Sequence, residues 1–250
     1  MKEKITFQNS KGQKLVGDLY SPETETNKVA IFCHGYGSTK ESSKVLPVAE
    51  NITKEGIAMF AFDLTDLGES ETKFEDSTIT QYIDDLRCAI DLFPDKIIAV
   101  IANSLGGIVS LQQTAKDKRI KALVLQSPVS IFPHKKTGDY SEENIKQWKE
   151  KGFIMTKRGR FGFQKINYSF YEDGLRYGDY SVYDNIKVPV LVIHGTADQS
   201  IDIARSKELI KHLENNRFII LEGADHRYTN PDHFNKVIEE TSKFLIEVLK

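Results

Sequence analysis

Short apolar runs alternate along this chain with longer amphipathic stretches. Residues 3–20 have the pattern of two strands joined by the turn "NSKGQ". Six further runs, rich in β-branched and aromatic residues, follow: KVAIFC, IAMFAF, KIIAVI, KALVLQ, VPVLVIH and RFIILE. These six runs lack alternating polar positions, which is typical of parallel strands buried on both faces of a sheet.

The amphipathic stretches between these runs predict helices. In one of them, apolar residues recur at helical spacing from Ile79 to Ile90, behind a cap at Ser77 or Thr78. The predicted helices cover residues 42–55, 78–93, 105–116, 203–214 and 234–249. This alternation predicts an α/β fold with an eight-stranded, mostly parallel sheet flanked by helices.

One stretch, residues 131–187, interrupts the alternation. It holds the only tryptophan, Trp148, together with many tyrosines, phenylalanines and charges of both signs. Within it, "GFIMTKRGRFGF" predicts a hairpin that turns at residues 157–160. We therefore expect a core domain of residues 1–130 and 188–250, with an inserted cap of residues 131–187. Such a cap would cover the carboxyl edge of the sheet, where open α/β sheets bind ligands.

Composition excludes several classes of protein. The chain has 250 residues, with 34 Lys and Arg against 36 Asp and Glu, whereas nucleic-acid binders are usually clearly basic. It has no apolar run long enough for a bilayer, and its start "MKEKITFQNS" lacks the apolar segment of a signal peptide. We therefore expect a cytoplasmic protein without nucleic-acid or membrane partners.

The two cysteines, Cys33 and Cys88, lie in an apolar strand and an amphipathic helix pattern, and we expect both to be buried free thiols. Because no Cys/His cluster is present, the sequence carries no signature of a zinc site, and we expect neither metal nor cofactor.

The stretch "IIAVIANSLGGIVSL" carries the first chemical signal. A strand that turns into a helix within a few residues needs small side chains at the corner, and Ala102 and Gly106 provide them. Ser104 would stand at the apex, with its hydroxyl exposed above the start of the helix. That position suits a nucleophile. The usual pattern has Gly where this chain has Ala102, and a methyl group is tolerated there if the residue keeps negative φ.

A serine nucleophile needs a base within hydrogen-bond reach and an acid that orients the base. Asp198 follows the strand in "VPVLVIHGTADQSI", and His226 follows the next strand in "RFIILEGADHRY". The order of serine, aspartate and histidine fits the chemistry. Asp202 is the alternative acid, although it is better placed to start a helix, and His233 is the alternative base.

The remaining candidates lack a supporting pattern. We expect His134 and His212 to face solvent, and His194 to lie in the floor of the loop that carries the acid. Asp225 directly precedes His226 and should point away from it.

The motifs "HGYGSTK", "FDLTDLGES", "ANSLGG", "VPVLVIHGTAD" and "EGADHRY" together resemble the α/β-hydrolase superfamily. They are most similar to small bacterial serine esterases of the cinnamoyl (feruloyl) esterase type. The resemblance covers the chain outside the cap and implies an α/β-hydrolase fold. It implies that Ser104 is the nucleophile, His226 the general base and acid, and Asp198 the residue that fixes the imidazole tautomer.

The same resemblance implies an oxyanion hole formed by the backbone N–H groups of Leu105 and Tyr36. Gly35 and Gly37 would let the second of these loops approach the oxyanion closely. We interpret His34 and Asp63 as structural residues that tie together loops near the site. Relatives often carry Gly at the positions of Ala102 and Asp66, so these departures concern the substrate rather than the mechanism.

These observations predict a carboxylic-ester hydrolase that works through an acyl-enzyme on a small-molecule ester, with an aryl or short-to-medium acyl group. The aromatic residues expected in its pocket are Tyr36, Trp148, Phe153, Phe161, Phe163 and Tyr168. A thioesterase, a peptidase or a monoacylglycerol lipase would use the same triad, and a non-catalytic binding protein on this fold is the remaining alternative. Lys157, Arg158 and Arg160 would receive an anionic substrate group or form a solvated hairpin tip. The sequence does not determine the oligomeric state, and a homodimer is compatible with it.

Overall fold

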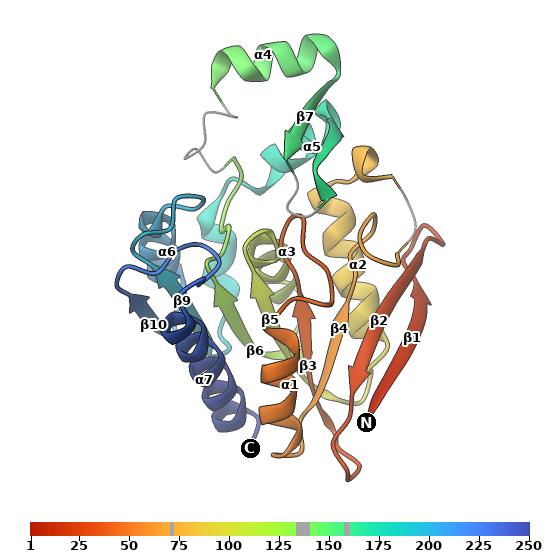
Figure 1. Ribbon diagram of the computed structural model, residues 1–250, viewed down its shortest axis with the longest axis vertical. Coiled ribbons are helices and arrows are strands. Elements are labelled where there is room, and N and C mark those ends of the chain that lie inside the picture. The colour runs from red at the N-terminus through yellow and green to blue at the C-terminus, as the bar shows by residue number, and fades with distance from the viewer. Residues whose placement is uncertain (71–72, 134–140, 158–160) are drawn as a thin grey trace.

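The computed structural model describes residues 1–70, 73–133, 141–157 and 161–250. Its centre is an eight-stranded sheet with the strand order β1-β2-β4-β3-β5-β6-β9-β10 (Figure 1). β1 and β2 are antiparallel to their neighbours, and the other strands run parallel. The strands are β1 (Lys2–Gln8), β2 (Lys14–Tyr20), β3 (Lys28–Cys33), β4 (Ala58–Phe62), β5 (Ile97–Asn103), β6 (Ile120–Gln126), β9 (Val190–Gly195) and β10 (Asn216–Leu221). The predicted eight-stranded α/β-hydrolase sheet is confirmed.

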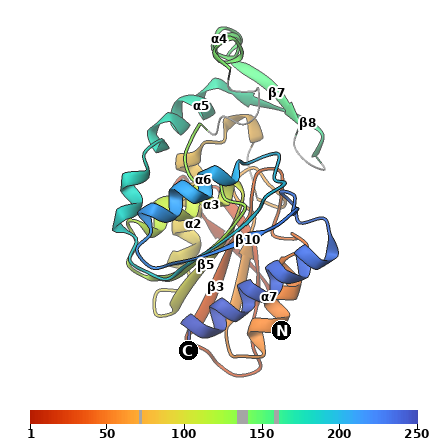
Figure 2. The ribbon, with the colours of Figure 1, turned by 90° about the vertical axis from the view of Figure 1, so that its left-hand side faces the viewer.

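Helices cover both faces of this sheet. Those outside the segment between β6 and β9 are α1 (Val45–Thr53), α2 (Ile79–Asp91), α3 (Leu105–Thr114), α6 (Ile203–Leu209) and α7 (Pro231–Val248). Figure 2 shows α1 and α7 on one side of the sheet, and α2 and α3 on the other. Two separate apolar clusters match these two layers. None of these helices, nor any other within the described ranges, is long and apolar enough to cross a bilayer.

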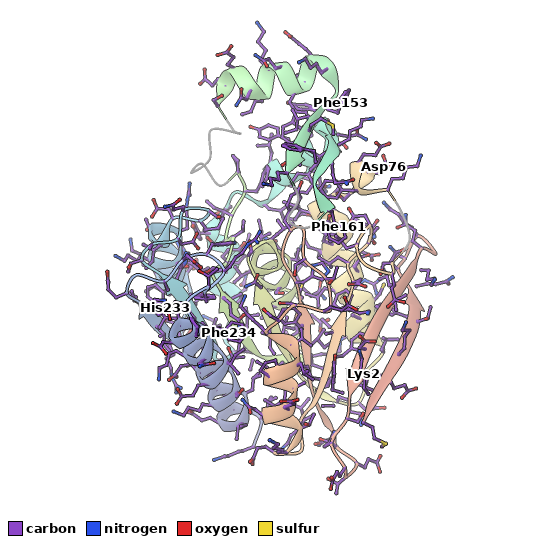
Figure 3. The ribbon with its side chains drawn as sticks, in the orientation of Figure 1. Lys2, Asp76, Phe153, Phe161, His233 and Phe234 are labelled. Atoms are coloured by element: carbon purple, nitrogen blue, oxygen red, sulfur yellow. The ribbon has the colours of Figure 1, made fainter. Side chains whose placement is uncertain are left out.

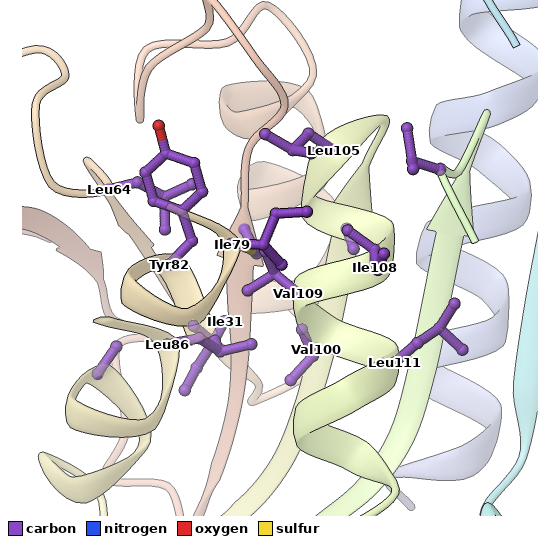
Figure 4. Packing of buried hydrophobic residues seen from close by; sticks show 14 of the residues in the cluster. Ile31, Leu64, Ile79, Tyr82, Leu86, Val100, Leu105, Ile108, Val109 and Leu111 are labelled. Atoms are coloured by element: carbon purple, nitrogen blue, oxygen red, sulfur yellow. The ribbon is translucent and has the colours of Figure 1, made fainter. Parts of the chain in front are cut away.

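Alternating side chains of the strands explain the two clusters. In β3, Ile31 and Cys33 pack toward α2 and α3, whereas Ala30 and Phe32 pack toward α1 and α7. Figure 4 shows the first layer, where α2 and α3 meet over β3 and β5. The central strands β3, β4, β5, β6 and β9 are therefore largely buried on both faces, as their apolar runs predict. The run in β10 is the exception, because β10 is an edge strand and its Ile220 is 47% exposed. Both cysteines are buried and free.

The helix boundaries differ from the predicted ones by up to five residues. α1 covers Val45–Thr53 rather than residues 42–55, and the other larger differences are in α7 and α6. α7 begins at Pro231, three residues earlier than the apolar pattern indicates, because Asn230 caps it and proline suits the first helical position. α6 ends at Leu209 and continues as a short 3₁₀ helix, Ile210–His212, instead of running to residue 214. Thr78 is the cap of α2, where its side chain accepts a hydrogen bond from the N–H of Gln81.

The segment between β6 and β9 contains α4 (Glu142–Lys151), β7 (Phe153–Lys157), β8 (Phe163–Asn167), α5 (Tyr168–Gly174) and the 3₁₀ helices Leu175–Tyr177 and Tyr180–Asn185. In the described part of this segment, the helix α4 and the hairpin of β7 and β8 lie beyond the carboxyl edge of the sheet (Figure 1), whereas residues 180–185 pack beside α3. β7 and β8 form the predicted antiparallel hairpin, in which Phe153 pairs with Asn167. Its turn lies in part outside the described residues.

Candidate active site

The order of the strands brings four loops to one edge of the sheet. β5 lies between β3 and β6, so the loop after β3 is next to Ser104, which follows β5. β9 and β10 are neighbours, and their following loops carry Asp198 and His226. Because parallel strands end at the same edge, residues far apart in sequence meet there.

Ser104 stands at the junction of β5 and α3 with φ of 51° and ψ of −117°, a conformation that non-glycine residues rarely adopt. Backbone hydrogen bonds fix it on both sides. Its N–H donates to the carbonyl of Gln126 at 3.0 Å, and its carbonyl accepts from the N–H groups of Gly107 and Val129 at 2.8 and 2.9 Å. These contacts hold the strained residue in place at the start of α3.

Small residues make this junction geometrically feasible. A Cβ atom at Gly106 would lie 2.3 Å from the carbonyl oxygen of Cys33, so any side chain would push α3 away from β3. Ala102 lies within β5 and is not among the residues with positive φ, so its methyl group is accommodated. Gly35 approaches the nucleophile from the neighbouring loop, where an added Cβ would lie 2.8 Å from the Cβ of Ser104.

The structure brings the three residues of the expected triad into one hydrogen-bonded chain. His226 Nε2 lies 3.0 Å from Ser104 Oγ, and His226 Nδ1 lies 2.7 Å from Asp198 Oδ2. An ionised carboxylate only accepts hydrogen bonds, so Nδ1 carries the imidazole hydrogen. Nε2 is therefore the basic nitrogen and faces the serine hydroxyl. This arrangement can take a proton from Ser104 and return it to a leaving group.

Four donors surround the carboxylate of Asp198, which is 2% exposed. Oδ1 accepts from the N–H groups of Ser200 and Ile201, both at 2.8 Å, and Oδ2 accepts from His226 and His194. Burial alone would raise the pKa of Asp198, but the hydrogen bonds from the two histidines and from Ile201, with the charge of His226, outweigh burial. They hold the pKa well below its usual range, so the carboxylate stays ionised.

His194 has a larger role than the sequence indicates. It is fully buried, and its Nε2 lies 3.1 Å from Asp198 Oδ2 and 3.2 Å from the carbonyl of Ile201. Because both partners are acceptors, Nε2 carries the hydrogen, and Nδ1 accepts from Ser206 Oγ at 2.7 Å. His194 thus fixes the position of Asp198 from behind. Its place at the end of β9 was the only sequence signal for this contact.

The loop that carries His226 is held by its neighbours in sequence. Asp225 points away from the imidazole, as expected, and accepts from the N–H groups of Arg227 and Thr229 at 2.9 and 3.0 Å. Tyr228 is buried with φ of 57°, and its hydroxyl donates to the carbonyl of Ile193 at 3.0 Å. This loop is therefore anchored to β9 on the side opposite the imidazole.

His34 organises the loop expected to contribute to the oxyanion hole. Its Nε2 accepts from the N–H of Leu64 at 3.1 Å, so Nδ1 carries the hydrogen and donates to the carbonyl of Gly35 at 2.9 Å. Leu105 occupies the first position of α3, where an N–H has no acceptor within the helix. The loop and the helix terminus thus lie on either side of Ser104.

The loop after β4 is tied to the same region. Asp63 accepts from the N–H of Lys40 at 2.8 Å and from the N–H of Glu69 at 3.0 Å, which is a structural role. Asp66 has φ of 75°, a value that explains why related chains often carry Gly here. In this protein its carboxylate accepts from the Tyr82 hydroxyl at 3.2 Å.

A cavity of about 300 Å³ opens at Ser104 and His226. Among the six aromatic residues expected to line the substrate pocket, Tyr36 lines this cavity. Its ring contacts Phe74 edge-on at a centroid distance of 5.2 Å and Phe170 at 6.5 Å. Tyr36 therefore connects the loop after β3 to the segment that lies above the sheet.

The other five aromatic residues lie elsewhere. Trp148 is 2% exposed, and its indole N–H donates to the carbonyl of Ile166 at 3.1 Å, so it is a core residue of the segment between β6 and β9. Tyr168 stacks on Tyr171 beside it. Phe153 and Phe163 are exposed on the hairpin strands, and Figure 3 shows Phe153 near α4. Phe161 lines a different cavity, together with Phe74 and Asp66. These five residues therefore do not line the described cavity at Ser104, and their place in a substrate pocket stays a prediction.

The other charged candidates do not join this arrangement. His233 lies half-buried in the first turn of α7 (Figure 3), and Asp202 caps α6, where it accepts from the N–H of Ala204 at 3.0 Å. His212 is half-buried and contacts Asp184 at 2.8 Å. Lys157 ends β7, whereas His134, Arg158 and Arg160 lie outside the described residues.

Comparison with known families agrees with the fold. A family model described as serine aminopeptidase, S33, matches residues 24–156, and one described as serine hydrolase (FSH1) matches residues 99–232. The chain belongs to the serine hydrolases of the α/β-hydrolase superfamily.

Individual relatives are distant. The human protein named palmitoyl-protein thioesterase ABHD10, mitochondrial, is 24% identical over 79% of this chain. The match spans 66% of the length of that protein. A monoglyceride lipase homolog of Monkeypox virus is 21% identical over 92% of this chain and 91% of its own. A putative esterase/lipase 2 of Mycoplasma pneumoniae is 28% identical over 84% of this chain and 87% of its own.

Two solved structures show the same fold. The ferulic-acid complex of Est1E from Butyrivibrio proteoclasticus superposes with a TM-score of 0.86 and 23% identity, over 98% of this chain and 99% of that one. Mouse ABHD10 superposes with a TM-score of 0.84 and 21% identity, over 99% of this chain and 100% of that one. At these identities the likeness establishes the fold alone.

Proposed function

We propose that this protein hydrolyses carboxylic esters through an acyl-enzyme formed on Ser104. The observation that carries the proposal is the hydrogen-bonded chain from Ser104 Oγ through His226 to Asp198, with distances of 3.0 and 2.7 Å. Ser104 attacks the acyl carbon while His226 takes its proton and then delivers it to the leaving alcohol. Water, deprotonated by His226, attacks the acyl-enzyme and releases the acid.

The oxyanion of each tetrahedral intermediate would be held by the N–H groups of Leu105 and Tyr36. Leu105 supports this role through its place at the first position of α3. Tyr36 supports it because the preceding residue, Gly35, brings that loop against Ser104. Removal of one such donor typically slows turnover by about a hundredfold or more.

The segment of residues 131–187 would act as the cap over this site, because its described elements α4, β7 and β8 lie beyond the carboxyl edge of the sheet (Figure 1). A thioester is the second candidate substrate class, favoured by the similarity to a protein named as a palmitoyl-protein thioesterase. Chemistry at the acyl carbon is the same for both leaving groups. The cytoplasmic location and the homodimer stay predictions of the sequence.

The test is hydrolysis of three substrates that share one acyl group and differ in the leaving group, as an aryl ester, a thioester and an anilide. Turnover should be highest for the ester or the thioester and should vanish in Ser104→Ala. The matched control is Ser10→Ala, since Ser10 is an exposed serine in the turn between β1 and β2. Equal turnover in Ser104→Ala and the unmodified protein would refute the proposal.

A further inference from the structure

The cavity at the nucleophile has a polar and cationic wall that the ester chemistry does not require. It is bounded by the loop after β3 and by the residues that lead into α1. Residues lining the cavity include Ser38, Thr39, Ser42, Ser43, Lys44 and Arg227. A site for purely apolar acyl chains would be lined mainly by apolar side chains.

Lys44 is the unusual member of this wall. Its residue is only 6% exposed, and its ammonium lies over the ring of Tyr228, 5.3 Å from the centroid. Within the described ranges no carboxylate forms an ion pair with it, and no side-chain hydrogen bond satisfies it. Buried charges in proteins are normally paired. Lys44 is thus a buried amino group at the cavity wall that forms no ion pair with any carboxylate of the described residues.

Burial also lowers the proton affinity of this lysine. Burial, reinforced by the nearby charge of Arg227, lowers the pKa of Lys44 to about 8. Asp225 opposes this shift only in part. An anion bound beside the ammonium would stabilise its charged form and raise the pKa again. The geometry and the charge balance therefore favour an anionic ligand on this side of the cavity.

Two further features add positive potential to the same wall. Arg227 directly follows His226, is exposed, and forms no ion pair with any carboxylate of the described residues. Lys44 also immediately precedes α1, a helix of nine residues whose positive end faces the cavity-lining residues 42–44. Glu41, at the exposed rim, is the one acidic residue among those that line the cavity.

We propose that Lys44 and Arg227 form an anion subsite, and that the substrate is an ester bearing a carboxylate a few bonds from its scissile carbonyl. The proposal rests on the proposed function, because the subsite shares its cavity with Ser104 and His226. The cavity volume of about 300 Å³ suits a short chain between the two groups. Lys44 would act as a specificity-determining residue that binds the distal carboxylate.

The experiment compares pairs of esters that differ only in this charge. One series comprises aryl monoesters of succinic, glutaric and adipic acid, each against the ester whose distal carboxylate is a carboxamide. A second series places the charge on the alcohol side, as acetylglycolate and acetyllactate against their amides. Hydrogen bonds to charged groups lead us to expect kcat/KM at least about tenfold higher for the carboxylate in one series.

Lys44→Met should bring this ratio close to one in the same series. Lys54→Met is the matched control, because Lys54 is an exposed lysine at the other end of α1 and its loss should leave the ratio unchanged. Calorimetric binding of the same ester pairs to Ser104→Ala gives a readout that needs no turnover. There, too, the carboxylate ester should bind about tenfold more tightly, and Lys44→Met should abolish the difference.

The possible failures are distinct. If the protein hydrolyses the neutral esters but shows a ratio of one or less in both series, the anion subsite is wrong and the ester hydrolase stands. An unchanged ratio in Lys44→Met also overturns the subsite. If no ester or thioester is hydrolysed, the proposed function fails, and the binding measurement alone then decides whether the subsite exists.

Discussion

The most informative single substitution is Asp198→Asn, because it keeps the shape of the side chain and changes its hydrogen-bonding pattern. Oδ1 of Asp198 accepts from two backbone N–H groups at 2.8 Å, those of Ser200 and Ile201. The asparagine must place its only oxygen there. Its NH₂ group then faces His226 Nδ1, which lies 2.7 Å from Oδ2 in the unmodified protein.

The consequence is a reversed imidazole tautomer. The amide N–H donates to Nδ1, so the imidazole hydrogen moves to Nε2 and points at Ser104 Oγ, 3.0 Å away. Nε2 then cannot accept the serine proton. The same tautomer defect in a serine protease lowers kcat by roughly ten-thousandfold, and we expect a loss of that order here. His194 Nε2 loses Oδ2 as an acceptor but keeps the carbonyl of Ile201 at 3.2 Å. The fold should persist, because this N–H and both backbone donors keep an acceptor.

The assay is steady-state hydrolysis of the best ester substrate, with the unfolding midpoint recorded for each variant. Asp202→Asn is the matched control: it removes the same charge from the same loop, and asparagine caps α6 about as well as aspartate. We expect its kcat to stay close to that of the unmodified protein. If Asp198→Asn retained more than about a tenth of kcat, the tautomer argument would be wrong.

Three further predictions follow from contacts near the site and from the helix termini. Gly35→Ala places a Cβ 2.8 Å from the Cβ of Ser104, so it should displace the oxyanion loop and lower kcat by about a hundredfold; an unchanged kcat would exclude this loop from catalysis. The pKa of Lys44 falls from 10.5 to about 8 on folding, so between pH 8 and pH 10.5 this lysine binds more protons in the unfolded chain than in the folded one. Stability should therefore rise from pH 8 to pH 10.5 by up to roughly 3 kcal/mol, and denaturation of Lys44→Met should lack this increment. Asn230→Ala should reduce the free energy of unfolding by about 1 kcal/mol through loss of the α7 cap, without altering kcat; a larger kinetic effect would place this helix terminus in the site.

The central part of the sheet was predictable because its strands are unbroken apolar runs, a pattern produced by burial on both faces. The edge strand β10 has a similar run although it is partly exposed. The meeting of Ser104, Asp198 and His226 followed from their positions after parallel strands, which end at one edge. Apolar periodicity misplaced a helix boundary where a polar capping residue, rather than an apolar one, sets the start of the helix. Asn230 and Pro231 start α7 before its first apolar residue, so periodicity alone places the helix start too late.

The pocket was the least predictable feature. An aromatic residue in an inserted segment either packs that segment or faces the ligand, and composition does not separate the two. Trp148 can be buried because its indole N–H donates to the carbonyl of Ile166. No sequence pattern links these two residues. The same holds for His194 behind Asp198 and for Lys44 over Tyr228. Such tertiary contacts decide the specificity of the site.

Covalent labelling distinguishes an activated Ser104 from an ordinary serine. The intact protein is incubated with a fluorophosphonate, and its mass and the modified peptide are determined. We expect one adduct, on Ser104, and no adduct in Ser104→Ala or His226→Ala. Absence of labelling of the intact protein, or an adduct that persists in Ser104→Ala, would show that Ser104 is not the nucleophile.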